Sequence, residues 1–141
     1  MTRRRDEEEF FDTYRSLKRY LTTLVGQAYA ELGLGTTQVR LLEHIAANAG
    51  VSQAELSRAT ESDPALTGRA LQTLVDRKWV LRTHSPDDRR AYVLQIGAGG
   101  RRVLDRVEKL RIRLGAKVVT LLDERDLADF ERIVARILAG A

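Results

Sequence analysis

The sequence predicts a mainly helical, α+β fold in which long terminal helices flank a compact lobe of shorter helices and one β-hairpin. Apolar residues recur at helical spacing near both ends of the chain, and two short capped helices follow each other in the middle. Residues 79–96 then change to a β-branched and aromatic composition. With 141 residues, of which 43% are hydrophobic and 31% charged, the chain can form one domain with its own core.

Composition excludes several classes of protein. The longest stretches without a charged residue have 11 residues, as in 20–30, and fall well short of the ~20 that a membrane-spanning helix needs. The first residues lead into an acidic run, so we expect no secretory signal peptide and a cytoplasmic protein. The chain has no cysteine, which excludes disulfides, thiolate chemistry and cysteine-ligated zinc.

The first two helices have clear periodicity and ends. A stripe of apolar residues repeats by four and three over 10–28, and the glycines at 33 and 35 end that helix. A second helix begins at Thr36 and Thr37, whose hydroxyls can cap it, and ends near Gly50. The residues that it is expected to bury are Val39, Leu42, Ile45 and Ala46.

Two short helices follow, joined by a tight polar turn. Ser52 and Glu55 form a capping box that opens a helix at roughly 53–60, with Leu56 and Ala59 inward. Asp63 is a favourable N-cap and Pro64 suits the first position of the next helix, at about 64–77. Its inward residues are expected to be Ala70, Leu71, Leu74 and Val75. The pair is a helix-turn-helix candidate.

The remaining chain predicts a hairpin and two more helices. Strands at 79–84 and 91–96 are separated by turn residues at 85–90. A long helix is expected at about 100–122, and Asp123 is expected to cap the last one. We therefore expect a single domain over 1–141, with terminal helices at 1–32 and 100–141 around a lobe at 36–98.

The order of three helices and a two-stranded ribbon is that of a winged helix-turn-helix. The third helix of such a lobe enters the major groove of DNA. On helix 64–77 the expected outward residues are Ala65, Thr67, Gly68, Arg69, Gln72 and Thr73. Arg69 can pair with guanine, Gln72 can read adenine and a threonine can meet a phosphate or a thymine methyl. The alternative is an ordinary solvated helix face.

The tip of the hairpin carries Arg89 and Arg90, which could reach into a narrow minor groove. Asp88 fits this interpretation if its carboxylate orients an arginine through a charge-assisted hydrogen bond. A charged, solvated turn is the alternative. Of the 24 basic residues 20 are arginine, which suits phosphate and guanine binding, although codon bias in a GC-rich genome gives the same excess.

Residues 67–96 resemble the multiple-antibiotic-resistance regulator (MarR) family. The resemblance lies in the recognition-helix arginine at Arg69, in Trp-Val-Leu-Arg at 79–82 and in Asp-Arg-Arg at 88–90. It places Arg90 on the arginine expected in the minor groove, and Thr36 to Leu42 resembles the family's second-helix opening. Gly68, Lys78 and Gly97 depart from the family pattern, which leaves the operator open but not the fold.

The predicted function is sequence-specific binding of duplex DNA by a homodimer that regulates transcription. Ser52, Thr37 and Gln38, at the starts of two lobe helices, complete the expected DNA contacts. The resemblance implies a repressor released by a small aromatic effector. The candidates to line its site are Tyr14, Tyr20, Tyr29 and His44, each with a place in the core as the alternative.

Other kinds of function find less support. The two histidines, His44 and His84, have no ligand spacing, so no metal or other cofactor is expected. No nucleophile, base and orienting group come together in the sequence, so we expect no enzyme. A different class remains open, in which the winged helix is a protein-interaction module that binds an acidic partner. Steep salt dependence on duplex DNA, with sequence preference, would distinguish the two.

Overall fold

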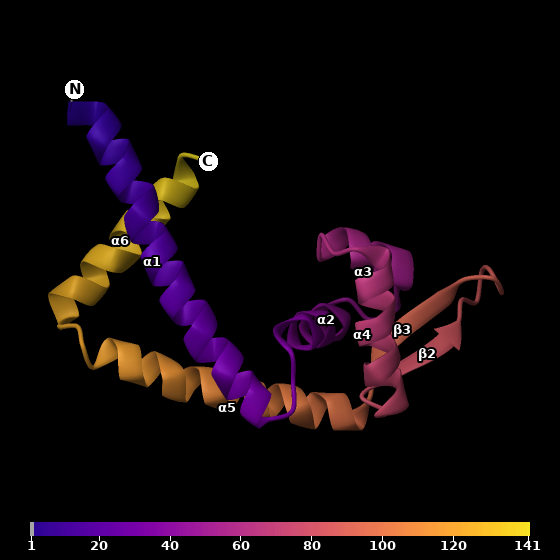
Figure 1. Cartoon of the computed structure of the whole chain (residues 1–141). Coiled ribbons are helices and arrows are strands. Elements are labelled where there is room, and N and C mark those ends of the chain that lie inside the picture. The colour runs from indigo at the N-terminus through magenta and orange to yellow at the C-terminus, as the bar shows by residue number, and fades with distance from the viewer. Residues whose placement is uncertain (1) are drawn as a thin grey trace. The chain divides into compact units, whose positions relative to one another are not determined.

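A computed structural model gives the backbone of residues 2–141 and the burial of residues 4–141. Its elements are α1 (Thr2–Glu31), α2 (Thr36–Ala47), β1 (Val51–Ser52), α3 (Gln53–Ala59), α4 (Pro64–Asp76), β2 (Val80–His84), β3 (Tyr92–Ile96), α5 (Ala98–Val119) and α6 (Glu124–Ala139), and Figure 1 labels all of them except β1. They form two compact units that meet within α5, one ending at Glu108 and the other beginning at Lys109. The predicted fold class, mainly helical with a winged helix-turn-helix, is confirmed.

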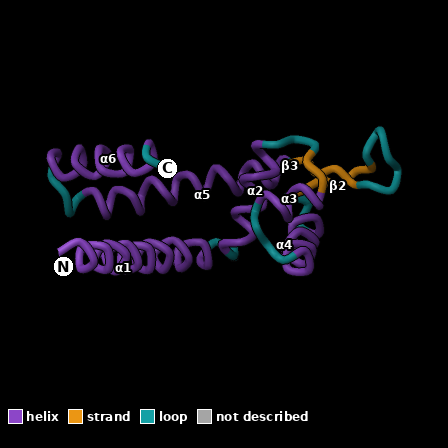
Figure 2. The backbone as a smooth tube through the Cα atoms, turned by 90° about the horizontal axis from the view of Figure 1, so that it is seen from above, coloured by secondary structure: helices purple, strands orange, loops and turns teal. Residues whose placement is uncertain are grey.

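The small sheet of the first unit has three strands rather than the two expected. All pairs are antiparallel in the order β1-β3-β2, and β2 pairs with β3 from Val80 opposite Ile96 to His84 opposite Tyr92. The unexpected strand β1 pairs Val51 with Leu94. Two residues are too few for any period to show in a sequence. In Figure 2 the loop between β2 and β3 projects beyond the helices of the lobe, and we call this hairpin with its loop the wing.

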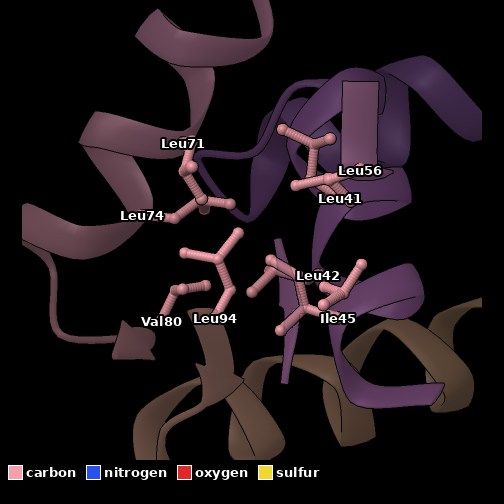
Figure 3. Close-up of a cluster of buried hydrophobic side chains, with 9 residues drawn as sticks. Leu41, Leu42, Ile45, Leu56, Leu71, Leu74, Val80 and Leu94 are labelled. Carbon is pink, nitrogen blue, oxygen red and sulfur yellow. The ribbon is translucent and has the colours of Figure 1, made fainter. Parts of the chain in front are cut away.

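The core of the lobe lies between the three short helices and the sheet. Figure 3 shows side chains from α2, α3 and α4 converging on those of β2 and β3. The fully buried members are Leu41, Leu42, Ile45, Leu56, Leu71, Leu74, Val80 and Leu94. Ala70 and Val75 are only half-buried at its edge. The expected burial of Ala59 is wrong, because the residue ends α3 on its solvent side.

Helix ends follow local chemistry. Gly33 ends α1 at a φ of +72°, a left-handed conformation that glycine adopts without strain. The N-cap of α2 is Gly35, whose amide donates to Gln38 Oε1 at 3.0 Å, so the expected capping by Thr36 and Thr37 is wrong. Both threonines already lie inside the first helical turn. Asp123 caps α6 as predicted, since its carboxylate accepts from the amide of Asp126 at 2.8 Å.

Both terminal regions carry exposed apolar residues. In the first unit, these lie along the N-terminal two-thirds of α1: Phe10, Phe11, Tyr14, Leu17 and Tyr20. In the second unit, α6 exposes Phe130, Ile133, Val134, Ile137 and Leu138. Among the residues that the structure describes, no helix combines the length and apolar character needed to cross a membrane.

Candidate nucleic-acid interface

The helix-turn-helix is built by two local caps that the sequence predicted. Ser52 Oγ accepts from the amide of Glu55 at 3.1 Å, and the Glu55 carboxylate accepts from the Ser52 amide at 3.3 Å. Asp63 Oδ1 accepts from the amide of Ala65 at 2.9 Å, with Pro64 at the first helical position. These bonds satisfy amides that a helix start leaves unpaired. They fix where α3 and α4 begin.

The outward face of α4 is the candidate surface for reading bases. Ala65, Arg69 and Gln72 are exposed, as predicted, and Gly68 is half-buried. Thr73 is half-buried, with its hydroxyl donating to the carbonyl of Arg69 at 3.3 Å. Leu66, which was not expected on this face, is 53% exposed there. Leu66 precedes Arg69 by three residues, so helical spacing alone could have placed the two side by side.

Thr67 is the one expected outward residue that the structure turns inward. Its side chain is fully buried, and its hydroxyl has no hydrogen-bond partner among the described residues. The inward stripe of α4 starts one turn earlier than expected, because Thr67, Leu71 and Leu74 share one helix face. The predicted exposure of Thr67 is therefore wrong, and its hydroxyl cannot reach a base or a phosphate from this position.

A chain of polar contacts joins α4 to the wing. Gln72 Nε2 donates to Asp76 Oδ1 at 2.8 Å, and Arg82 Nη1 of β2 donates to Gln72 Oε1 at 3.4 Å. From the sequence, Gln72 was expected to read a base, Arg82 was noted only within the Trp-Val-Leu-Arg match, and Asp76 was not singled out. Arg82 lies two residues after the buried Val80, and alternation along a strand puts both on the face toward the helices. This spacing in the sequence could have placed Arg82 on the side of β2 that faces α4.

The tip of the wing exposes both predicted arginines, Arg89 and Arg90. In the described part of the chain neither guanidinium forms an ion pair. Asp88 does not orient an arginine side chain as expected. Its carboxylate instead accepts from the backbone amide of Arg90 at 2.9 Å, as short aspartate turns commonly do. Asp88 thus shapes the loop through the main chain and leaves both guanidinium groups without a partner among the described residues.

The other predicted DNA contacts lie at helix starts. Thr37 is exposed near the N-terminus of α2, while Gln38 is half-buried and bonded to Gly35. Ser52 is half-buried at the start of α3, and its hydroxyl serves the cap. Thr37 is thus exposed, whereas the side chains of Gln38 and Ser52 form hydrogen bonds at the starts of their own helices.

The four effector candidates do not gather at one point. The three tyrosines lie on α1, and its rise per residue separates the Cα atoms of Tyr14 and Tyr29 by about 22 Å. Tyr29 is buried at 2% exposure, whereas Tyr14 and Tyr20 are about half exposed. The alternative that these two tyrosines belong to the core of the chain is therefore wrong. His44 is half-buried and lines a shallow hollow with Asn48 and Glu55.

The fold and this surface define a winged helix-turn-helix protein. Residues 32–91 match the model of the MarR family. The resemblance seen in the sequence is thereby confirmed. None of the curated proteins matches the chain.

Solved structures share the fold over most of the chain. The apo form of wild-type MarR from E. coli is 21% identical with a TM-score of 0.83, and the match covers 90% of this chain and 94% of that one. YusO from Bacillus subtilis is 19% identical with a TM-score of 0.78, covering 96% and 98%. An E. coli MarR variant complexed with operator DNA is 21% identical with a TM-score of 0.73, covering 92% and 94%.

Proposed function

We propose that this chain binds duplex DNA sequence-specifically as a homodimer and represses transcription until a small aromatic effector releases it. One observation carries the proposal. Arg69 on the outward face of α4 and the arginines of the wing tip are exposed on the same lobe, without ion-pair partners among the described residues. The fold shared with a MarR variant complexed with operator DNA supports it.

The proposed docking places α4 in the major groove. Its 13 residues span about 20 Å, and the base edges are within reach of the exposed Arg69 and Gln72. The wing carries Arg89 and Arg90 toward the minor groove, whose negative potential attracts guanidinium groups. Thr37, Gln38 and Ser52 would contact the backbone from the starts of α2 and α3, where helix amides favour phosphate.

The proposed dimer rests on the exposed apolar residues of α1 and α6. Large exposed apolar patches on a folded chain mark interaction sites. Phe10 and Phe11 on α1, and Phe130 and Ile137 on α6, are each about half exposed in the single chain. A two-fold dimer through the regions 1–32 and 100–141 would cover such residues and present two α4 helices to a pseudo-palindromic site.

The proposed effector would act on this dimer rather than on the DNA surface. Tyr14, Tyr20, Tyr29 and His44 remain the proposed lining residues. Since the tyrosines spread along α1, a compact ligand would contact only some of them from one chain. A titration of a protein–DNA complex with phenolic compounds tests this part, and release of the DNA is the expected result.

The experiment that tests the central proposal measures affinity for labelled duplexes by fluorescence anisotropy across a range of salt concentrations. We expect log affinity to fall linearly with log salt, by about 0.9 for each phosphate neutralised. We also expect preference for duplexes selected from a random pool over unrelated ones. Absence of duplex binding, together with capture of an acidic protein by the wing, would favour the interaction-module alternative.

A further inference from the structure

The amide of Gln72 is held from both sides by charged groups. Asp76 Oδ1 accepts from its nitrogen at 2.8 Å, and Arg82 Nη1 donates to its oxygen at 3.4 Å. A carboxylate can only accept and a guanidinium can only donate. The amide can therefore make both contacts in one orientation only, and a 180° flip would break both.

Arg82 is itself fixed by the wing. Its backbone pairs with Leu94 in the sheet, and its guanidinium carbon lies 5.7 Å from the centre of the Tyr92 ring. The rings of Tyr92 and His84 stack at 4.6 Å. Arg82 Nε is buried and has no hydrogen-bond partner in the described part of the chain. The buried end of the guanidinium thus directs its Nη1 toward α4.

The two contacts leave Gln72 with a specific remaining capacity. A primary amide has two N–H donors and two oxygen lone pairs, of which Asp76 and Arg82 each take one. One donor and one acceptor remain. Adenine presents one acceptor, N7, and one donor, the N6 amino group, whereas guanine presents two acceptors on the same edge. An amide held in one orientation matches adenine and mismatches guanine.

We propose that Arg82 and Asp76 are positioning residues that hold the Gln72 amide for reading adenine. The proposal rests on the proposed function, because it requires α4 to lie in the major groove. Holding the side chain before binding removes the ordering cost that a free glutamine would bear in the complex. The wing therefore contributes to base specificity through Arg82, in addition to any contact that its tip makes with DNA.

The test uses the full chain and a duplex selected from a random pool by the wild-type protein. Gln72→Ala identifies the base pair that Gln72 reads, as the position where preference for adenine is lost. The readout is the ratio of Kd values between duplexes with adenine and with each other base at that position. Loss of one bidentate contact corresponds to about a 5- to 150-fold fall in this ratio.

Arg82→Met and Asp76→Ala are each expected to lower the ratio about five-fold or more, while changing overall affinity in opposite directions. Arg82→Met removes a positive charge, so binding to every duplex should weaken. Asp76→Ala removes a negative charge, so binding to every duplex should strengthen. A merely structural role cannot produce lower discrimination together with higher affinity.

Arg77→Met is the matched control. Arg77 donates to the carbonyl of Gly33 at 3.3 Å and lies over the Trp79 ring at 4.8 Å, without contacting Gln72. Arg77→Met removes the same charge as Arg82→Met, and its ratio of Kd values between duplexes should equal that of the wild type. Melting curves verify folding, and Asp76→Ala alone decides if Arg82→Met does not fold.

Two results would overturn this inference while leaving DNA binding intact. In the first, Gln72→Ala loses the preference for adenine at one position, but Arg82→Met and Asp76→Ala keep the full ratio of Kd values there. In the second, Gln72→Ala keeps the preference at every position. A wild-type protein that prefers no duplex would instead overturn the proposed function, and the inference with it.

Discussion

The start of α5 packs against the backbone of Trp79 so closely that residue 100 must be glycine. A Cβ added at Gly100 would lie 2.3 Å from the Trp79 carbonyl oxygen and 2.7 Å from Ile96 Cδ1. The carbonyl cannot move away freely, because it also accepts from the amide of Gly97 at 2.8 Å. We therefore expect Gly100→Ala to destabilise the lobe.

The expected loss of stability in Gly100→Ala is the difference between two opposing effects. Alanine in place of glycine favours a helix by about 1 kcal/mol. Inserting a methyl group into a closely packed site costs typically ~1–3 kcal/mol, and a contact with backbone as short as this belongs at or above the upper end. The net loss should be about 2 kcal/mol, which lowers Tm by roughly 4–8 °C for a chain of this size.

The assay is thermal unfolding followed by circular dichroism, with Gly115→Ala as the matched control in the same helix. A Cβ at Gly115 would meet no atom within 4 Å, so that variant gains helix propensity without a clash. Its Tm should equal or exceed that of the parent. A Gly100→Ala variant that melted as high as Gly115→Ala would show that the close approach to Trp79 does not constrain the fold.

Four further predictions concern the interface and the core. Arg69→Ala should weaken the binding free energy on a selected duplex by ~1–3 kcal/mol and relax the preference at one base pair per half-site. Arg90→Ala should weaken binding to most duplexes and lower the slope of log affinity against log salt concentration by about one unit per half-site. Unchanged binding by Arg69→Ala with a lower Tm would make that residue structural. Deleting residues 1–31 removes the buried side chains at the end of α1 and should give aggregated or unfolded protein. A well-behaved DNA-binding monomer, seen by light scattering, would contradict the dimer. Thr67→Val should raise the free energy of unfolding by about 1 kcal/mol in chemical denaturation, because it replaces a buried hydroxyl that has no hydrogen-bond partner among the described residues. A lower free energy of unfolding would reveal such a bond. Lys78 has a φ of +61°, a left-handed conformation that strains a non-glycine residue by ~1–2 kcal/mol. Lys78→Gly should raise Tm slightly, because relief of this strain exceeds the entropic cost of glycine, ~0.5–1 kcal/mol. A lower Tm would show that the Lys78 side chain stabilises the turn.

Most elements of the fold could be predicted from the sequence because their signals are local. The Asp63 cap with Pro64 marked the start of α4, and Asp123 marked the start of α6 within one residue. The change of composition at 79–96 located both strands of the wing. Strand β1 could not be found in the same way, because its two residues are defined only by pairing with β3.

The candidate site was predictable in its charged parts and less so in its contacts. The exposure of Arg69 could be predicted from helix periodicity, and that of the wing-tip arginines from the composition of the turn. The burial of Thr67 depends on where the inward stripe of α4 begins, and the hydrogen bond that the Asp88 carboxylate accepts from the Arg90 amide depends on loop geometry. The contact between Arg82 and Gln72 joins residues ten apart on two different elements, so it required the packing of β2 on α4.

The wing and α4 are parts of one packed unit rather than separate attachments. The inward face of α4 supplies Leu71 and Leu74 to the same core that takes Val80 and Leu94 from the two wing strands. Side chains in such a core interdigitate at crystal-like density, so a shift of one element displaces the others. The distance between the outward face of α4 and the strands of the wing is therefore set by apolar packing. Polar contacts across the surface, such as that of Arg82 with Gln72, can then orient individual side chains within a frame that is already fixed.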